Sequence, residues 1–135
     1  MPEIRFCVLG DPVPQPRARH AARNGFVRTY TPDNGIEAYK SAIGIAAQAA
    51  GISRLASPLV VEVEAVFGRP PSHLLKSGAL RKGAPGWPRP DWDNIAKGVC
   101  DALLAQDSVI TKGSCEKRYA LPGEIAHTVV VVMER

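Results

Sequence analysis

Five stretches of the chain are predicted to be β-strands from the order of their apolar and polar residues. Residues 3–10 and 58–67 alternate apolar and polar side chains, as a strand with one buried face does. Residues 26–30 follow an Asn-Gly pair that favours a tight turn. Residues 114–120 and 124–133 are separated by a Leu-Pro-Gly sequence, and we expect them to form a hairpin.

Two further stretches have apolar residues at helical spacing. The first helix is predicted to begin at residues 31–33, where a threonine hydroxyl that can cap the helix precedes a proline at the first helical position. It is expected to end at Gly51. The second helix is predicted to extend over residues 90–104, because its apolar residues recur on one side and its charged residues on the other.

Two segments lack this periodicity. Residues 11–25 contain three prolines and are expected to form an extended or irregular arm. Residues 68–90 contain five prolines and four glycines, which predicts a long exposed loop. We therefore predict a single α/β (α+β) domain over residues 1–135. In this domain, strands from both ends of the chain and the central strand share one mixed β-sheet with two helices packed on it.

The composition is that of a folded globular protein. The chain has 135 residues, of which 45% are hydrophobic and 22% are charged, which argues against disorder. Its longest weakly polar stretch, residues 41–52, is too short to cross a bilayer, and Glu3 and Arg5 interrupt any apolar region of a secretory signal. We expect a cytoplasmic protein with no membrane partner. The cysteines lack C-x-x-C spacing and are predicted to be reduced, buried thiols: Cys7, Cys100 and Cys115.

The charged residues are unevenly distributed around a net charge of +4. Two windows contain no acidic residue, one between Asp11 and Asp33 and the other between Glu64 and Asp91. We expect these windows to bind the phosphate backbone of nucleic acid through Arg17, Arg19, Arg23, Lys76, Arg81, Lys82 and Arg89. An acidic cluster follows the second window and consists of Asp91, Asp93, Asp101 and Asp107. This segregation favours a polyanion on one surface and a cation at the acidic cluster, although basic loops are often only solvated.

The second predicted helix carries most of this acidic cluster on one face. At about 100° per residue, Lys97 lies about 40° from Asp93 and Asp101 about 80° from it. Asp91 stands just ahead of the helix, so that its carboxylate and that of Asp93 can reach one ion. Mg²⁺ prefers such oxygen ligands and needs only two or three carboxylates beside phosphate and water.

A purely structural interpretation explains much of the same pattern. The helix macrodipole favours carboxylates such as Asp91 and Asp93 at a helix start. Lys97 stands four residues after Asp93, the spacing of an ion pair along one helix. The spacing alone therefore leaves both the metal site and the structural role open.

Other chemistries have no support in the sequence. Histidine metal motifs, serine nucleophile elbows, Walker loops and dinucleotide-binding fingerprints are all absent from it. Trp87 and Trp92 flank the end of the second basic window, where they either stack on bases or pack against the core.

Taken together, these residues resemble the RusA-type Holliday junction resolvases, small phage and prophage endonucleases that cut four-way DNA junctions. The most specific part is PDWDNIAK at residues 90–97 with DAL at residues 101–103, which is similar to the family's PDxDNxxK and DAL sequence. Residues 10–12 and 17–19 are similar to the family's amino-terminal GxP and RxR, and Asp107 precedes an apolar pair. The resemblance covers nearly the whole chain.

The resemblance implies a Mg²⁺-dependent endonuclease, with Mn²⁺ as a substitute ion, that acts as a homodimer on four-way DNA junctions in recombination and repair. It implies that Asp91, Asp93 and Asp107 are the metal ligands and that these three, with Lys97, are the catalytic residues. A homodimer with two-fold symmetry would place two active sites on a junction that is itself close to two-fold symmetric.

Two other functions remain open from the residues alone. In the first, the protein binds nucleic acid without cleaving it, the aspartates only cap and solvate a helix, and binding does not need Mg²⁺. In the second, the basic windows bind an acidic protein partner, and DNA would compete for that surface only by its charge.

Overall fold

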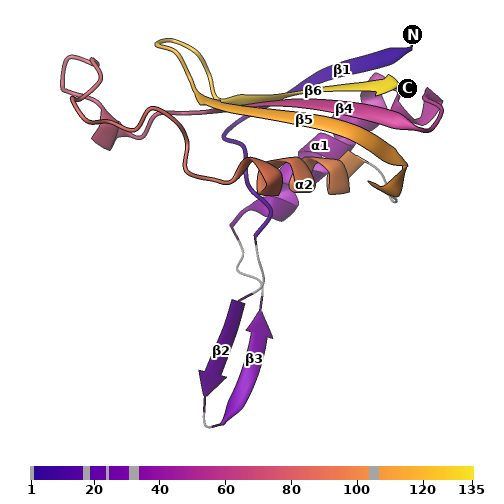
Figure 1. Cartoon of the computed structure of the whole chain (residues 1–135). Coiled ribbons are helices and arrows are strands. Elements are labelled where there is room, and N and C mark those ends of the chain that lie inside the picture. The colour runs from indigo at the N-terminus through magenta and orange to yellow at the C-terminus, as the bar shows by residue number, and fades with distance from the viewer. Residues whose placement is uncertain (1, 17–18, 24, 31–33, 104–106) are drawn as a thin grey trace.

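The computed structural model describes residues 2–16, 19–23, 25–30, 34–103 and 107–135. It contains one mixed sheet with two helices packed on it, which confirms the predicted fold class (Figure 1). The strands and helices are β1 (Glu3–Leu9), β2 (Arg19–Arg23), β3 (Phe26–Tyr30), α1 (Ile36–Ala50), β4 (Leu59–Phe67), α2 (Trp92–Leu103), β5 (Ile110–Tyr119) and β6 (His127–Glu134). Short 3-10 turns are η1 (Ile52–Arg54), η2 (Pro71–His73) and η3 (Asp107–Val109). None of the described helices is long and apolar enough to cross a membrane.

The main sheet has the strand order β1-β6-β4-β5. Strands β4 and β5 are parallel, whereas β6 lies antiparallel between β1 and β4. The prediction that the last two strands form a hairpin is therefore wrong, because β4 separates them. The buried residues of β6, Thr128, Val130 and Val132, show why: a strand this apolar is covered best in the middle of the sheet.

The connection between β5 and β6 crosses the end of β4 instead of making a tight turn. The amide of Ala120 donates to the carbonyl of Phe67 at 2.8 Å, which fixes the start of this connection on β4. The Arg118 guanidinium binds both carboxylate oxygens of Glu124, at 2.6 and 2.8 Å, and also contacts Glu64 at 3.2 Å. These hydrogen bonds lower the pKa of Glu124 to about 2, so the carboxylate stays ionised and holds the connection in place.

Both helices cover the same face of the sheet, and the core lies between them and it (Figure 1). The main cluster contains apolar residues from α1, α2, β4 and β6, including Ile43, Val61, Val99, Leu103 and Val130. Within it, the hydroxyls of Tyr39 and Thr128 share a buried hydrogen bond of 2.6 Å. Burial raises the pKa of Tyr39 to about 12, so the phenol stays neutral and satisfies the threonine.

The ends of the two helices lie close to their predicted positions. The first described turn of α1 begins at Ile36 after Gly35, and its predicted start at residues 31–33 lies outside the described residues. Gly51 ends the helix as predicted, with φ of 95° and an amide that donates to the carbonyls of Ala47 and Gln48. Helix α2 occupies residues 92–103 of the predicted 90–104.

The arm at residues 11–25 is irregular in its first part, whereas its second part is extended and forms a strand, in keeping with the prediction of an extended or irregular arm. Residues 19–23 form β2, which pairs antiparallel with β3 in a separate two-stranded sheet. The prolines end at Pro16, so β2 has all its amides available for pairing. Gly25, with φ of 80°, supports the predicted turn, and Figure 1 shows the hairpin standing out from the sheet and its helices.

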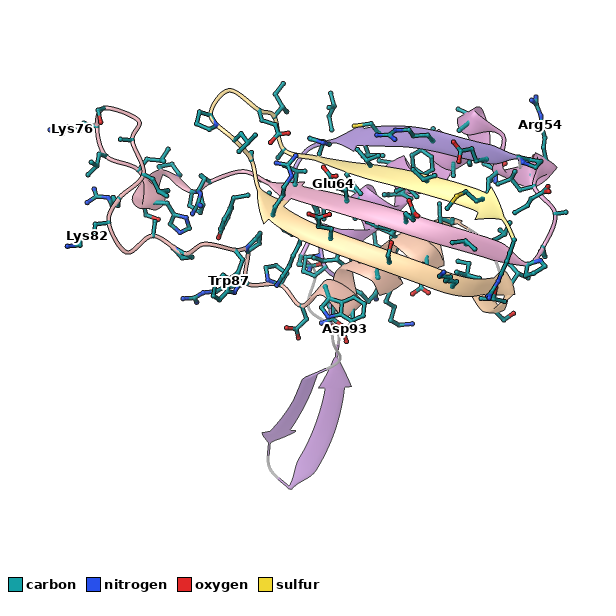
Figure 2. The ribbon with its side chains drawn as sticks, turned by 45° about the horizontal axis from the view of Figure 1, so that its top comes forward. Arg54, Glu64, Lys76, Lys82, Trp87 and Asp93 are labelled. Atoms are coloured by element: carbon teal, nitrogen blue, oxygen red, sulfur yellow. The ribbon has the colours of Figure 1, made fainter. Side chains whose placement is uncertain are left out.

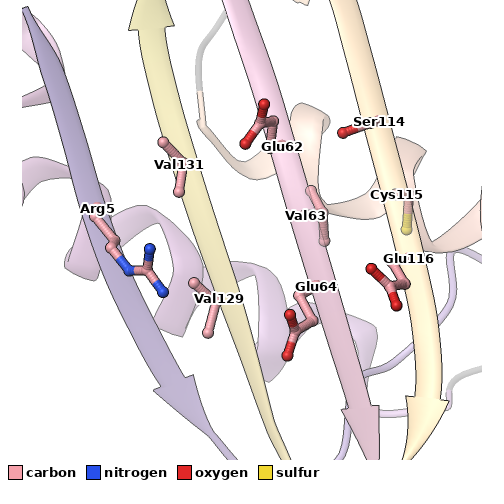
Figure 3. A pocket seen from close by; sticks show the side chains of 9 residues that line it. All are labelled: Arg5, Glu62, Val63, Glu64, Ser114, Cys115, Glu116, Val129 and Val131. Atoms are coloured by element: carbon pink, nitrogen blue, oxygen red, sulfur yellow. The ribbon is translucent and has the colours of Figure 1, made fainter.

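None of the described helices lies over the second face of the main sheet, and side chains of this face line a pocket (Figure 3). Glu62 and Glu64 of β4 and Glu116 of β5 point into this pocket, across the valines of β6 from Arg5 of β1. Cys7 also lies on an exposed position of β1, so the prediction that it is buried is wrong. Cys100 and Cys115 are half-buried, and burial raises the pKa of the Cys115 thiol to about 11.

The hydrogen bond between Tyr39 and Thr128 leads to a prediction about stability. Replacing Tyr39 with Phe leaves the buried Thr128 hydroxyl without its partner, and we expect the free energy of unfolding to fall by about 1–3 kcal/mol. The double variant Tyr39→Phe, Thr128→Val removes both polar groups and should recover part of this loss. Urea unfolding of the three proteins measures the effect, and equal stability of the single variant and the wild type would contradict it.

Candidate active site at the start of the second helix

Asp91 and Asp93 lie together at the first turn of α2, and both are exposed to solvent. The backbone carbonyl of Asp91 accepts hydrogen bonds from the amides of Asn94 (3.1 Å) and Ile95 (3.2 Å), so Asp91 stands where the helix begins. One carboxylate oxygen of Asp93 accepts a hydrogen bond from the Asn94 amide at 3.0 Å. The helix start thus presents two carboxylates in adjacent positions, and its macrodipole favours their negative charge.

Lys117 of β5 attaches this helix start to the sheet. Its ammonium group donates hydrogen bonds to the carbonyl oxygens of Pro88 (2.8 Å) and Pro90 (2.7 Å). Pro88 itself is fully buried. Prolines have no amide hydrogen to donate in strand pairing, and the contact with the sheet is made instead by their carbonyl oxygens, which accept from Lys117. The position of Asp91, the next residue, is fixed by this contact.

The segment that leads into the hairpin arm contacts the same helix. The amide of Gln15 donates to the carbonyl of Asn94 at 3.0 Å. Gly98, one turn further on, lies beside the same segment, since a Cβ atom built there would be in ordinary van der Waals contact with the Gln15 nitrogen at 3.6 Å. The base of the arm is therefore packed beside the first turns of α2.

Lys97 and Asp101 form an ion pair further along α2. The Lys97 ammonium lies 3.6 Å from a carboxylate oxygen of Asp101, which is also 4.0 Å from the ammonium of Lys40 on α1. Asp101 is thus bound to two lysines within the helix layer. The Lys97 side chain is 60% exposed, so its charge faces solvent one turn beyond Asp93.

Asp107 is the first residue of η3, and its side chain lies outside the part of the structure that is described. Residue Val109 of this turn packs with Leu103 in the main core cluster, so η3 lies at the C-terminal end of α2. Ten residues separate Asp93 from Leu103, or about 15 Å along the helix. The structure therefore places Asp91 and Asp93 two residues apart at the start of α2 and the backbone of Asp107 beyond its opposite end (Figure 1).

The basic loop and the hairpin arm extend in different directions from the start of α2 (Figure 1). Figure 2 shows Asp93 between the hairpin arm and the loop that carries Lys76 and Lys82. Arg81 and Arg89 of the same loop are exposed, and the Arg81 side chain donates to the carbonyl of Leu74 at 3.1 Å. Arg17 lies outside the described residues, and only the backbone of Arg19 and Arg23 is described, in β2.

The loop at residues 68–90 is exposed and irregular as predicted, and hydrogen bonds within it hold its shape. The amide of Arg81 donates to the carbonyl of His73 at 2.8 Å, and that of Leu75 donates to Ala79 at 2.8 Å, which closes its outer part on itself. At its base, the Arg69 guanidinium lies 4.0 Å above the centre of the Tyr119 ring. The basic side chains of the loop therefore stand on a framework that hydrogen bonds define.

Carboxylate oxygens at the start of α2 have the right chemistry for a hard divalent cation, which takes oxygen ligands. Among the side chains that the structure describes, no group of three or more His, Cys, Asp or Glu residues is placed to hold a metal ion. Any such ion would therefore take two ligands, Asp91 and Asp93, from this part of the chain.

Sequence reasoning missed Lys117 and Gln15 as residues that position the site. Lys117 had a recognisable signal, because it occupies the inward-facing register of its strand between Cys115 and Tyr119. A lysine at such a position needs acceptors nearby. Gln15 had no comparable signal, since its contact is made by its backbone.

The Lys117 contact predicts a change that can be measured. Lys117→Met keeps the apolar stem and removes the donors, and we expect the free energy of unfolding to fall by about 1–3 kcal/mol. Amide exchange should also rise at residues 91–95. Lys112→Met, on an exposed position of the same strand, is the control and should change neither quantity. Equal exchange in the two variants would show that Lys117 does not hold the helix start.

Comparison with known proteins places the chain in a family. The model of the family described as endodeoxyribonuclease RusA matches residues 10–131. The search of curated proteins found no match. The matched region contains the helix start, the basic loop and the base of the arm. Because the match covers nearly the whole chain, the protein belongs to the RusA endodeoxyribonuclease family, whose members resolve Holliday junctions.

Proposed function

We propose that this endonuclease hydrolyses phosphodiesters of four-way DNA junctions with Mg²⁺ as its cofactor and Mn²⁺ as a substitute. The observation that carries the proposal is the pair Asp91 and Asp93, exposed at a helix start that Lys117 anchors. The pair lies between two basic segments, so a DNA phosphate that binds these segments is led toward the carboxylates.

The two carboxylates would hold the metal ion. Mg²⁺ commonly uses one or two carboxylates together with waters and phosphate oxygens, so the described donors suffice once a phosphate is bound. When bound, the ion lowers the pKa of a water that attacks phosphorus and neutralises charge on the phosphate. The anchored helix start keeps both carboxylates in place while the phosphate enters.

Asp107 stays a predicted third ligand. Its turn follows the C-terminal end of α2, and Leu103 at that end is about 15 Å from Asp93 along the helix axis. In this proposal, Asp107 contributes from the second subunit of the homodimer. Such a dimer would also place two active sites on the junction for paired cuts.

Lys97 supports the reaction in this proposal through its charge. Its ammonium lies one turn beyond Asp93 and is exposed, within the region that an incoming phosphate occupies. Its ion pair with Asp101 is partly solvated and therefore weak enough to open. Lys97 would then stabilise negative charge on the phosphate oxygens in the transition state.

The basic residues would bind the DNA backbone on both sides of the cleaved phosphodiester. On one side are the loop residues Lys76, Arg81, Lys82 and Arg89, which are all exposed. On the other side is the arm, which carries Arg17, Arg19 and Arg23. Contacts of this kind give affinity without sequence preference and depend strongly on salt.

Replacing Asp93 with Asn tests the ligand role directly. We expect cleavage of a synthetic four-way junction to slow by about 100-fold or more, because each loss of about 1.4 kcal/mol in transition-state stabilisation is tenfold in rate. Junction binding should remain measurable by gel shift. Glu37→Gln is the matched control, since Glu37 is an exposed carboxylate in the first turn of α1 and should leave the rate unchanged. Cleavage by Asp93→Asn at the wild-type rate would refute the ligand role. If the wild-type protein binds the junction but does not nick it in the presence of Mg²⁺, a non-catalytic DNA-binding function would be favoured instead.

The double variant Arg81→Ala, Lys82→Ala tests the backbone contacts. We expect weaker binding to all junction sequences alike, and a slope of log affinity against log salt that is smaller by up to about 2. Arg54→Ala, Lys112→Ala removes the same charge from two exposed positions away from the loop, and Figure 2 shows Arg54 at the far end of the molecule. An effect confined to certain sequences, or an equal effect of the two double variants, would contradict the assignment.

A further inference from the structure

The chain has only two tryptophans, and both are exposed beside the proposed active site. Trp87 is 71% exposed and Trp92 is 58% exposed. Of the two roles that the sequence left open for them, packing against the core is therefore excluded. A large aromatic side chain in water is costly, so two of them next to each other in one short segment require an explanation.

Their exposure does not come from a loose segment. Pro88, directly after Trp87, is fully buried, and the carbonyls of Pro88 and Pro90 accept hydrogen bonds from Lys117. Trp92 is the first residue of α2 and is fixed by the helix itself. The backbone thus holds both indoles toward solvent. Binding of a ligand to them would cost little conformational entropy, because the backbone of this segment is already ordered.

The surroundings identify the chemistry of that ligand. The exposed residues Arg89, Asp91 and Asp93 belong to the same short segment as the two tryptophans, and Figure 2 labels Trp87 and Asp93 on it. An apolar protein surface that covered the tryptophans would have to desolvate these charges without compensation. A nucleotide presents a flat base to an indole, and its phosphate to an arginine or a metal ion.

We propose that Trp87 and Trp92 form a stacking site for unpaired or unstacked DNA bases next to the phosphodiester that is cut, an inference that rests on the proposed function. A base can lie on an indole only after it leaves its own stack. Bases at a branch point leave the stack more easily than those within a linear duplex. The two tryptophans therefore favour branched DNA over duplex DNA, and they give the enzyme selectivity for structure without reading sequence.

Tryptophan fluorescence tests this inference, because no other tryptophan contributes to the signal. A synthetic four-way junction and a linear duplex of the same length are titrated into the protein with Ca²⁺ in place of Mg²⁺, and anisotropy of labelled DNA records binding in parallel. We expect the junction to quench the fluorescence more than the duplex at equal occupancy. Trp87→Phe and Trp92→Phe each leave one reporter and assign the quenching to a residue.

Affinity provides the second measurement. Stacking on one indole contributes about 1–3 kcal/mol per base, so Trp87→Ala and Trp92→Ala should each weaken junction binding at least about fivefold and duplex binding less. Ile125→Ala is the matched control, since Ile125 is 68% exposed on the connection between β5 and β6 and should leave junction binding unchanged.

The outcomes separate the two proposals. If anisotropy shows junction binding and Mg²⁺ supports cleavage, but the fluorescence is unchanged and the alanine variants bind like the wild type, the stacking site is refuted while the proposed function stands. Equal quenching by junction and duplex would also refute the selectivity. If the wild type neither binds nor cuts the junction, the proposed function fails and the stacking site fails with it.

Discussion

The position of the candidate site depends on one interaction, the contact of the Lys117 ammonium with the carbonyls of Pro88 and Pro90. The segment before α2 has prolines at alternate positions, which lack amide hydrogens and cannot extend the sheet. The ammonium of Lys117 on β5 donates to the carbonyl oxygens of Pro88 and Pro90, and a charged donor makes stronger hydrogen bonds than a neutral amide. Trp87, Asp91 and the first turn of α2 all take their places from this contact.

Strand topology explains why the contact forms where it does. Because β4 and β5 are parallel, the chain must return from the end of one to the start of the other, and α2 makes this return. The long basic loop and the start of α2 therefore lie beyond the carboxyl ends of both strands, where ligand sites of parallel sheets commonly form. Lys117, near the end of β5, is then close to the proline segment.

The sequence predicts the helices and the alternation within single strands better than it predicts which strands pair with each other. Alternation in β1 and β4, the end of α1 at Gly51 and the polar face of α2 are consequences of neighbouring residues, and the structure has them as predicted. The false hairpin of β5 and β6 arose because adjacent strands usually pair, whereas burial of Val130 and Val132 places β6 in the middle of the sheet. Within the site, spacing along one helix predicted that Asp91 and Asp93 are neighbours. The predicted helix over residues 90–104 also placed Asp107 beyond its C-terminal end, but spacing could not show where the Asp107 side chain lies.

A helix-capping role for Asp91 and Asp93 agrees with the hydrogen bond from the Asn94 amide, but it explains only those two residues. It does not account for two exposed tryptophans on an anchored segment, nor for the exposed basic residues of the loop before an acidic helix start. Exposed aromatic area and segregated like charges both cost free energy in the isolated protein. A polyanion with accessible bases offsets both costs at once, since its phosphates neutralise the cations and its bases cover the indoles. The same ligand brings a phosphodiester to the carboxylates, so a nuclease explains with one partner what capping leaves unexplained.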